Sequence, residues 1–150
     1  RVLELLAQSG AFLSGGILIG SHAFSAYQGM LGVEWPEPAM RTQDLDVGSL
    51  NSISVAIRED APDVKSVLLD SGMGFFEVPG LDRKSPSTSF KIRGQEFHVD
   101  LLTPLHGPDS TTPVRLQHFN SYAHPVRFLD FLLEDAQIAV IPFRGGILVN

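Results

Sequence analysis

The sequence predicts an α/β or α+β domain in which helices flank a mixed β-sheet. Apolar stretches at helical spacing alternate with short apolar strands early in the chain, and strand-like segments follow one another later. The 150 residues suit one compact domain spanning 1–150. With 43% hydrophobic and 19% charged residues, the composition is that of a folded chain rather than a disordered one.

Three segments have the pattern of helices. Val2–Ser9 is a short apolar helix that Gly10 closes, and Ala61–Ser71 has a proline in its first turn. Ser21 has the residue type of an N-cap and opens a helix that reaches Gly32. Residues at helical spacing in this helix are Ala23, Phe24, Tyr27, Met30 and Leu31, and Phe12, Phe24 and Tyr27 are expected in the core.

The strands are expected to be short, with glycine and proline marking the turns between them. Gly32–Arg41 and Thr103–Arg115 are predicted loops, and Arg144-Gly145-Gly146 is a predicted hairpin turn. The expected strands are Ile17–Gly20, Asp44–Val47, Phe75–Val78, Ser87–Arg93, Glu96–Leu102, His118–Tyr122, Ala136–Pro142 and Gly146–Val149.

Composition excludes several classes of protein. No apolar run reaches the roughly 18 residues of a membrane span, and no signal-peptide pattern opens the chain. The absence of cysteine excludes disulfides and is compatible with the cytoplasm, which we expect as the location. A net charge of -6 argues against a broad nucleic-acid surface. Because the chain starts without methionine and ends in a strand pattern, we expect a segment of a longer protein or a processed chain. For a segment, the missing C-terminal region is expected to contribute to the site.

Two carboxylates, Asp44 and Asp46, lie one residue apart in the strand D-L-D-V. Alternate strand residues share a face, so both acids point one way and Leu45 and Val47 the other. Two like charges about 7 Å apart repel by about 2 kcal/mol at an effective dielectric near 20. The fold therefore has to expose these acids at a strand end, pair them with bases or bind a cation between them.

A third acid, Asp100, shares a face with Glu96 and His98 in a second apolar strand. Arg41 is the only base close in sequence to the first pair, so a divalent cation such as Mg²⁺ explains the acids well. A calcium loop does not fit, because the twelfth position counted from Asp44 is Val55. For an isolated pair of acids, a solvent-exposed strand end stays open as the alternative.

The stretch I-L-I-G-S-H ends an apolar strand with Gly20 and Ser21 at a helix start. Such a turn offers backbone N–H groups and the positive end of a helix dipole, which favour a phosphate group. Neither a Walker P-loop nor a Rossmann glycine pattern is present. Gly20 and Ser21 are therefore candidate phosphate-binding residues, with a plain helix cap as the alternative.

These pieces together resemble the nucleotidyltransferase superfamily of the DNA polymerase beta type. Its pattern is an apolar strand ending in Gly-Ser, an Asp-x-Asp strand and a third acid on a later strand. G-S-H-A-F-S-A-Y followed by R-T-Q-D-L-D-V is similar to a bacterial branch of nucleotidyltransferase-like proteins. The resemblance covers residues 12–102, and the extra length before the acid pair falls in Val33–Met40.

The resemblance implies a nucleotidyltransferase fold and a role for each candidate residue. Asp44 and Asp46 would hold Mg²⁺ or Mn²⁺ at the triphosphate, and Asp100 would complete the metal site and take the proton of the acceptor hydroxyl. Gly20 and Ser21 would hold the β and γ phosphates. Arg41 would reach a phosphate or pair with Asp44.

Several other residues are assigned a local role. Lys91 and Arg93 form a basic cluster with Lys84, and a solvated edge strand is favoured for them over contact with triphosphate or RNA. His22 and His98 are expected to make local hydrogen bonds. Trp35, in a polar loop near the predicted site, is a candidate for stacking on a base.

The implied activity is metal-dependent transfer of a nucleoside monophosphate from an NTP to an acceptor hydroxyl, with release of pyrophosphate. The acceptor stays open between a small molecule, a protein and RNA, and no membrane partner is expected. Two alternatives remain. One is a catalytically silent module that binds RNA or a protein partner, and the other is a small domain with solvent-exposed acids.

Overall fold

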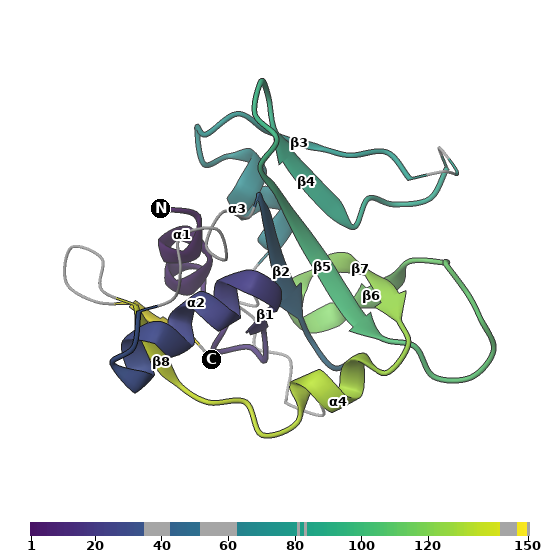
Figure 1. Ribbon diagram of the computed structural model, residues 1–150. Helices are drawn as coiled ribbons and strands as arrows, with labels where there is room; N and C mark the ends of the chain where they lie inside the picture. The colour runs from purple at the N-terminus through teal and green to yellow at the C-terminus, as the bar shows by residue number, and fades with distance from the viewer. Residues whose placement is uncertain (35–42, 52–62, 81, 83, 142–146, 150) are drawn as a thin grey trace.

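The computed structural model describes residues 1–34, 43–51, 63–80, 82, 84–141 and 147–149 (Figure 1). Within them, seven strands form one mixed sheet, with the order β1-β2-β5-β4-β3 and with β7 joining β5 to β6. β2 and β7 run parallel to β5, and the other neighbours are antiparallel. The strands are β1 Ile17–Ile19, β2 Asp44–Gly48, β3 Phe75–Glu77, β4 Ser89–Ile92, β5 His98–Pro104, β6 Val114–Leu116, β7 Ser121–Val126 and the separate hairpin β8 Ala139–Ile141 with β9 Ile147–Val149.

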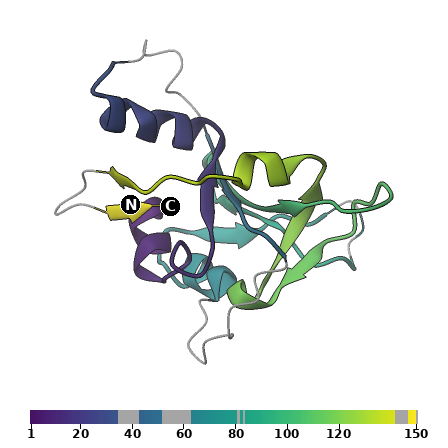
Figure 2. The same ribbon diagram turned by 90° about the horizontal axis from the view of Figure 1, so that it is seen from below.

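Helices cover both faces of this sheet. Figure 2 shows α2 and α4 on one side of the strands and α1 and α3 on the other. This arrangement confirms the predicted mixed sheet flanked by helices. The helices are α1 Val2–Gln8, α2 Gly20–Leu31, α3 Val64–Leu69 and α4 Leu129–Leu133, with a 3-10 turn at Gln117–Phe119. Among the described helices, none has the length and apolar character needed to cross a lipid bilayer.

The main core lies on the face covered by α1 and α3. Leu45 and Val47 of β2, and Val99 and Leu101 of β5, are each at most 1% exposed. They pack in one cluster with apolar residues of α1 and α3. The alternation of acidic and apolar residues along both strands produces this arrangement, because each buried residue places its acidic neighbour on the opposite face.

A smaller cluster on the opposite face joins α4 to β1. It contains Ile19, Leu129 and Leu133. A Cβ on Gly48 would lie 2.7 Å from Cδ2 of Leu133, so the absence of a side chain at Gly48 allows this close packing. Gly48 follows Asp46 by two positions and shares its face. The helix α4 therefore covers the later part of β2 and leaves the acidic part uncovered.

A buried polar bridge ties the end of β2 to the chain before β1. The Ser49 hydroxyl donates to the carbonyl of Gly15 at 2.9 Å and lies 2.8 Å from Nε2 of His118. Ser49 is 0% exposed and His118 is 9% exposed. A proton on Nε2 lets the ring donate to Ser49, so that every member of the bridge is paired.

Several predicted boundaries were wrong, mainly in the second half of the chain. The predicted loop 103–115 contains the end of β5 and the start of β6, and the predicted strand His118–Tyr122 is the 3-10 turn followed by β7. No helix was predicted where α4 lies. Ala61, Pro62 and the predicted hairpin turn at 144–146 lie outside the described residues.

The helix α2 also differs from expectation. It begins at Gly20 rather than after Ser21, and its N-cap Ile19 makes no side-chain capping bond. Phe12 is buried as predicted, but Phe24 and Tyr27 are 45% and 43% exposed and are not core residues. The helical spacing of its apolar residues correctly predicted a helix here. The error arises because the apolar stripe faces a cavity rather than the closed core.

Candidate active site

The three predicted acids lie on one face of adjacent strands. In the parallel pairing of β2 with β5, Asp46 stands opposite Asp100 and Asp44 stands opposite His98. Side chains at paired positions share a face of the sheet, so Asp44, Asp46, His98 and Asp100 form a compact group. The prediction that the acids share one face, with Leu45 and Val47 on the other, is confirmed.

His98 lies between two of the acids. Its Nε2 is 3.3 Å from Oδ1 of Asp44 and 3.3 Å from Oδ2 of Asp100. Its Nδ1 is 3.1 Å from the carbonyl oxygen of Glu96. The ring of His98 therefore lies within ion-pair distance of both carboxylates, and its other nitrogen faces a backbone carbonyl. Sequence reasoning gave His98 a local role and missed its position in the site.

His22 has the local role that was expected. Its Nδ1 lies 2.9 Å from the carbonyl oxygen of Asp44, and its ring meets Phe97 edge to face at a centroid distance of 6.3 Å. These contacts attach the first turn of α2 to the start of β2. His22 therefore positions the acid-bearing strand.

Asp46 is partly buried beside the other two acids. Burial is the main cause that raises the pKa of Asp46 above its usual value, and the charges of Asp100 and Asp44 raise it further. The nearby His98 and His22 act in the opposite direction. A carboxylate in this position gains stability from a cation, since a positive charge offsets both the burial and the repulsion.

Gly20 packs directly against Asp46. Its φ is +69°, and a Cβ built on it would lie 2.6 Å from Oδ2 of Asp46. Only glycine adopts this left-handed conformation easily and leaves this space. Gly20 and Ser21 occupy the first turn of α2, where backbone N–H groups have no partner inside the helix. The structure thus brings the predicted phosphate turn beside the predicted metal site.

The described side chains do not converge on a single point. Among the described residues, no group of three or more His, Cys, Asp or Glu side chains is arranged to hold a metal ion. The donor chemistry nevertheless fits Mg²⁺ or Mn²⁺, because carboxylate oxygens are the ligands these ions prefer. Asp44 and Asp100 turn toward His98, and convergence on a cation requires these side chains to rotate.

Comparison with known proteins decides the family. A family model described as Nucleotidyltransferase matches residues 1–150. The chain belongs to this nucleotidyltransferase family. Membership gives it a general role in nucleotidyl transfer and a nucleotide substrate. Searches of curated proteins and of solved structures gave no match.

Two predicted residues of this nucleotidyltransferase, Arg41 and Trp35, lie outside the described residues. The prediction that Lys91 lies on an edge strand was wrong, because β4 pairs with β3 on one side and with β5 on the other. Lys91 stands opposite His98, and its Nζ lies 2.8 Å from Oε2 of Glu96. The lysine is therefore part of the acid-bearing face.

A cavity of about 290 Å³ adjoins the phosphate turn of the nucleotidyltransferase. It lies between α2 and the chain that joins α4 to β8, and Gly20 is on its wall. The partly exposed Tyr27 and Met30 of α2 also line it. The three acids do not line it, so this cavity is separate from the acid-bearing face.

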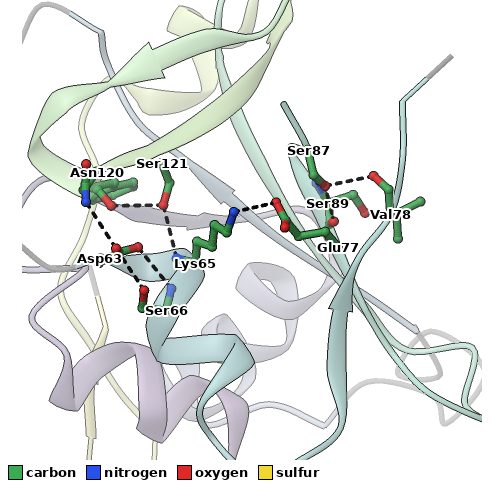
Figure 3. A network of polar contacts seen from close by, with 10 residues as sticks. Asp63, Lys65, Ser66, Glu77, Val78, Ser87, Ser89, Asn120 and Ser121 are labelled. Carbon is green, nitrogen blue, oxygen red and sulfur yellow. Dashed lines mark hydrogen bonds and ion pairs between the residues drawn. The ribbon is translucent and has the colours of Figure 1, made fainter. Parts of the chain in front are cut away.

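A second polar cluster lies at the start of α3 (Figure 3). The helix α3 covers the apolar face of the sheet, opposite to the acids. Asp63 caps α3 by accepting from the Ser66 N–H at 3.0 Å, and Asn120 donates to the same carboxylate at 3.1 Å. Lys65 pairs with Glu77 at 3.0 Å. These contacts tie α3 to β3 and to the start of β7. Because the groups satisfy one another, we interpret the cluster as structural.

Proposed function

We propose that this nucleotidyltransferase moves a nucleoside monophosphate from an NTP to an acceptor hydroxyl and releases pyrophosphate, with Mg²⁺ or Mn²⁺ as cofactor. The observation that carries the proposal is the position of Asp46. Asp46 is paired with Asp100 across β2 and β5, and on its other side its carboxylate lies against Gly20. A metal site and a phosphate turn in contact are what transfer from a triphosphate requires.

The first turn of α2 would bind the triphosphate. The helix has 12 residues, so its N-terminus carries a substantial positive dipole end. The N–H groups of Gly20 and Ser21 lie in the first turn of α2 and have no acceptor within the helix, so they can donate to phosphate oxygens. The missing side chain at Gly20 lets a phosphate approach the backbone beside Asp46.

Asp44, Asp46 and Asp100 would hold the cation. When bound, Mg²⁺ or Mn²⁺ supplies positive charge that neutralises the phosphate oxygens and the acids together. The acids themselves are graded in exposure: the side chain of Asp44 is 56% exposed and that of Asp100 is 27% exposed. Asp46 lies against Gly20, while the exposed parts of Asp44 and Asp100 can turn toward a ligand.

Asp100 would also accept the proton of the acceptor hydroxyl. A carboxylate is a suitable base when it lies on the side from which the hydroxyl arrives. Asp100 is partly accessible to solvent and is flanked by β4, which carries no further acid on this face. His98 contacts Asp100 and Asp44 together, so it would position both carboxylates.

One observation favours the alternative of a silent binding module. The contact of His98 with Asp44 and Asp100 gives these two acids a partner within the chain. A domain that never binds a cation could be stable with this pairing alone. The two histidines relieve the repulsion between Asp46 and Asp100 only in part, because burial and the charges of Asp100 and Asp44 still raise the pKa of Asp46, and for this reason we favour the enzyme.

Calorimetric titration of each NTP in Mg²⁺ separates the two functions. We expect the wild-type chain to bind at least one NTP only in the presence of the metal. The Asp44→Ala/Asp46→Ala variant should lose this binding. A matched control, Asp70→Ala/Asp130→Ala, removes one exposed acid just after α3 and one in α4, and should bind as the wild type does. Absence of NTP binding by folded wild-type protein would exclude the enzyme for this chain.

A further inference from the structure

The acid-bearing face continues from β5 onto β4. In the antiparallel pairing of these strands, Lys91 stands opposite His98 and Ser89 stands opposite Asp100. Combined with the pairing of β5 and β2, this gives two rows of side chains across three strands. One row is Lys91, His98 and Asp44, and the other is Ser89, Asp100 and Asp46.

Lys91 makes an ion pair on this face that a ligand can replace. Its ammonium group pairs with Glu96, whose side chain is 74% exposed, while the lysine side chain is 32% exposed. The hydrogen bond and charge of Lys91 lower the pKa of Glu96, so the partner is a carboxylate at neutral pH. Ion pairs with an exposed member contribute little net stability. Lys91 can therefore leave Glu96 for an anionic ligand at small cost.

The order of strands fixes the side of the site on which Lys91 lies. Gly20 is on the β1 side of Asp46, and Lys91 is on the β4 side of Asp100. In a displacement at phosphorus, the attacking and leaving oxygens are in line on opposite sides. If pyrophosphate leaves toward the phosphate turn, the acceptor enters from the side of β4.

We infer that Lys91 binds an anionic group, a phosphate or a carboxylate, on the acceptor beside its reacting hydroxyl. The inference rests on the proposed function and adds the chemical class of the acceptor to it. Lysine is a point charge with a flexible stem and binds either anion. Ser89 places only a small hydroxyl side chain next to Asp100, where the acceptor hydroxyl is expected.

The test measures binding of small probes to the chain saturated with Mg²⁺ and the α,β-methylene analogue of the preferred NTP. The probes are glycerol 3-phosphate, glycerate and glycerol, which share hydroxyl groups and differ in charge. We expect glycerol 3-phosphate or glycerate to bind at least about 10-fold more tightly than glycerol. A preference for one of the two anions identifies phosphate or carboxylate as the recognised group.

Lys91→Gln should lose this preference and keep its affinity for the NTP analogue. Arg93→Gln is the matched control, because it removes an equal charge just beyond the end of β4, and it should retain the preference. Lys91→Arg should retain most of it. Equal binding of all three probes by the wild type would overturn the inference, as would loss of analogue affinity in Lys91→Gln. No analogue binding by the wild type would overturn the proposed function as well.

Discussion

Gly20 lies against the carboxylate of Asp46, which leaves no room for a side chain on the glycine. A Cβ on Gly20 would lie 2.6 Å from Oδ2 of Asp46, and the backbone of Gly20 has a φ of +69°. The contact links the turn that opens α2 to the central acid of the sheet. It makes the phosphate turn and the candidate metal site one structural unit.

We therefore expect Gly20→Ala to displace the Asp46 carboxylate. The variant should lose about 1 kcal/mol of unfolding free energy from backbone strain. It should also bind metal and NTP about 10-fold more weakly, because the acid has moved. Urea denaturation and calorimetry measure the two effects.

The matched control is Gly72→Ala. Gly72 has a φ of +70°, and a Cβ there meets no described atom within 4 Å. This variant should show a similar loss of stability with unchanged NTP binding. Equal NTP binding by Gly20→Ala and the wild type would contradict the role of the contact.

Asp46→Asn should raise the melting temperature and abolish metal-dependent NTP binding. The pKa of Asp46 is raised above 3.8 in the folded state, mainly by burial. The folded state therefore holds this proton more tightly than the unfolded state does. The stability contributed by Asp46 is present below pH 3.8 and is lost as pH rises through the folded pKa. At neutral pH, asparagine removes this penalty.

Thermal unfolding at pH 7 by circular dichroism measures the effect of Asp46→Asn. The exposed Asp70→Asn serves as the control and should leave the melting temperature close to that of the wild type. A lower melting temperature for Asp46→Asn would mean that the carboxylate stabilises the fold.

The bridge between His118 and Ser49 should make the protein sensitive to mild acid. Burial lowers the pKa of His118 below 6.5, so the folded state disfavours the charged ring. The unfolded state then binds more protons, and stability falls as pH drops below 6.5 toward the folded pKa. Urea unfolding at a series of pH values measures this slope. His118→Asn should flatten it between pH 6.5 and the folded pKa of the histidine, and an unchanged slope would argue against this origin.

Thr103→Val should be neutral or stabilise the protein by about 1 kcal/mol. Thr103 is 0% exposed, and its hydroxyl has no hydrogen-bond partner among the described residues. Valine keeps the shape and removes the unpaired hydroxyl. Urea denaturation tests this, with Thr103→Ala as a comparison that should destabilise by leaving a cavity. A loss of stability in Thr103→Val would show that the hydroxyl is satisfied.

Asp63→Ala should destabilise the protein by about 1 kcal/mol without changing NTP binding. The variant removes the cap of α3 and the acceptor of Asn120 (Figure 3). The cluster is on the face of the sheet opposite to the acids, so the site should be unaffected. Urea denaturation and NTP titration of the same samples measure both quantities. Weaker NTP binding would show that this cluster supports the site.

The sequence by itself determined the local features of this nucleotidyltransferase. Alternation along D-L-D-V and H-V-D-L placed the acids on one face of their strands, since side-chain direction in a strand depends only on position. Gly20 before an apolar helix predicted the phosphate turn for the same local reason. The helical spacing of residues in α2 also predicted a helix, but it did not predict that the apolar residues of this helix line a cavity.

Only the tertiary structure decided which residues meet across strands. The register of β5 against β2 places His98 between Asp44 and Asp100, and the position of β4 inside the sheet brings Lys91 to the same face. Pairing register and strand order depend on contacts between segments far apart in the chain, and α4 is held by such contacts with β1. Periodicity within one segment carries no information about them. The acids were therefore found from the sequence, and their neighbours only from the fold.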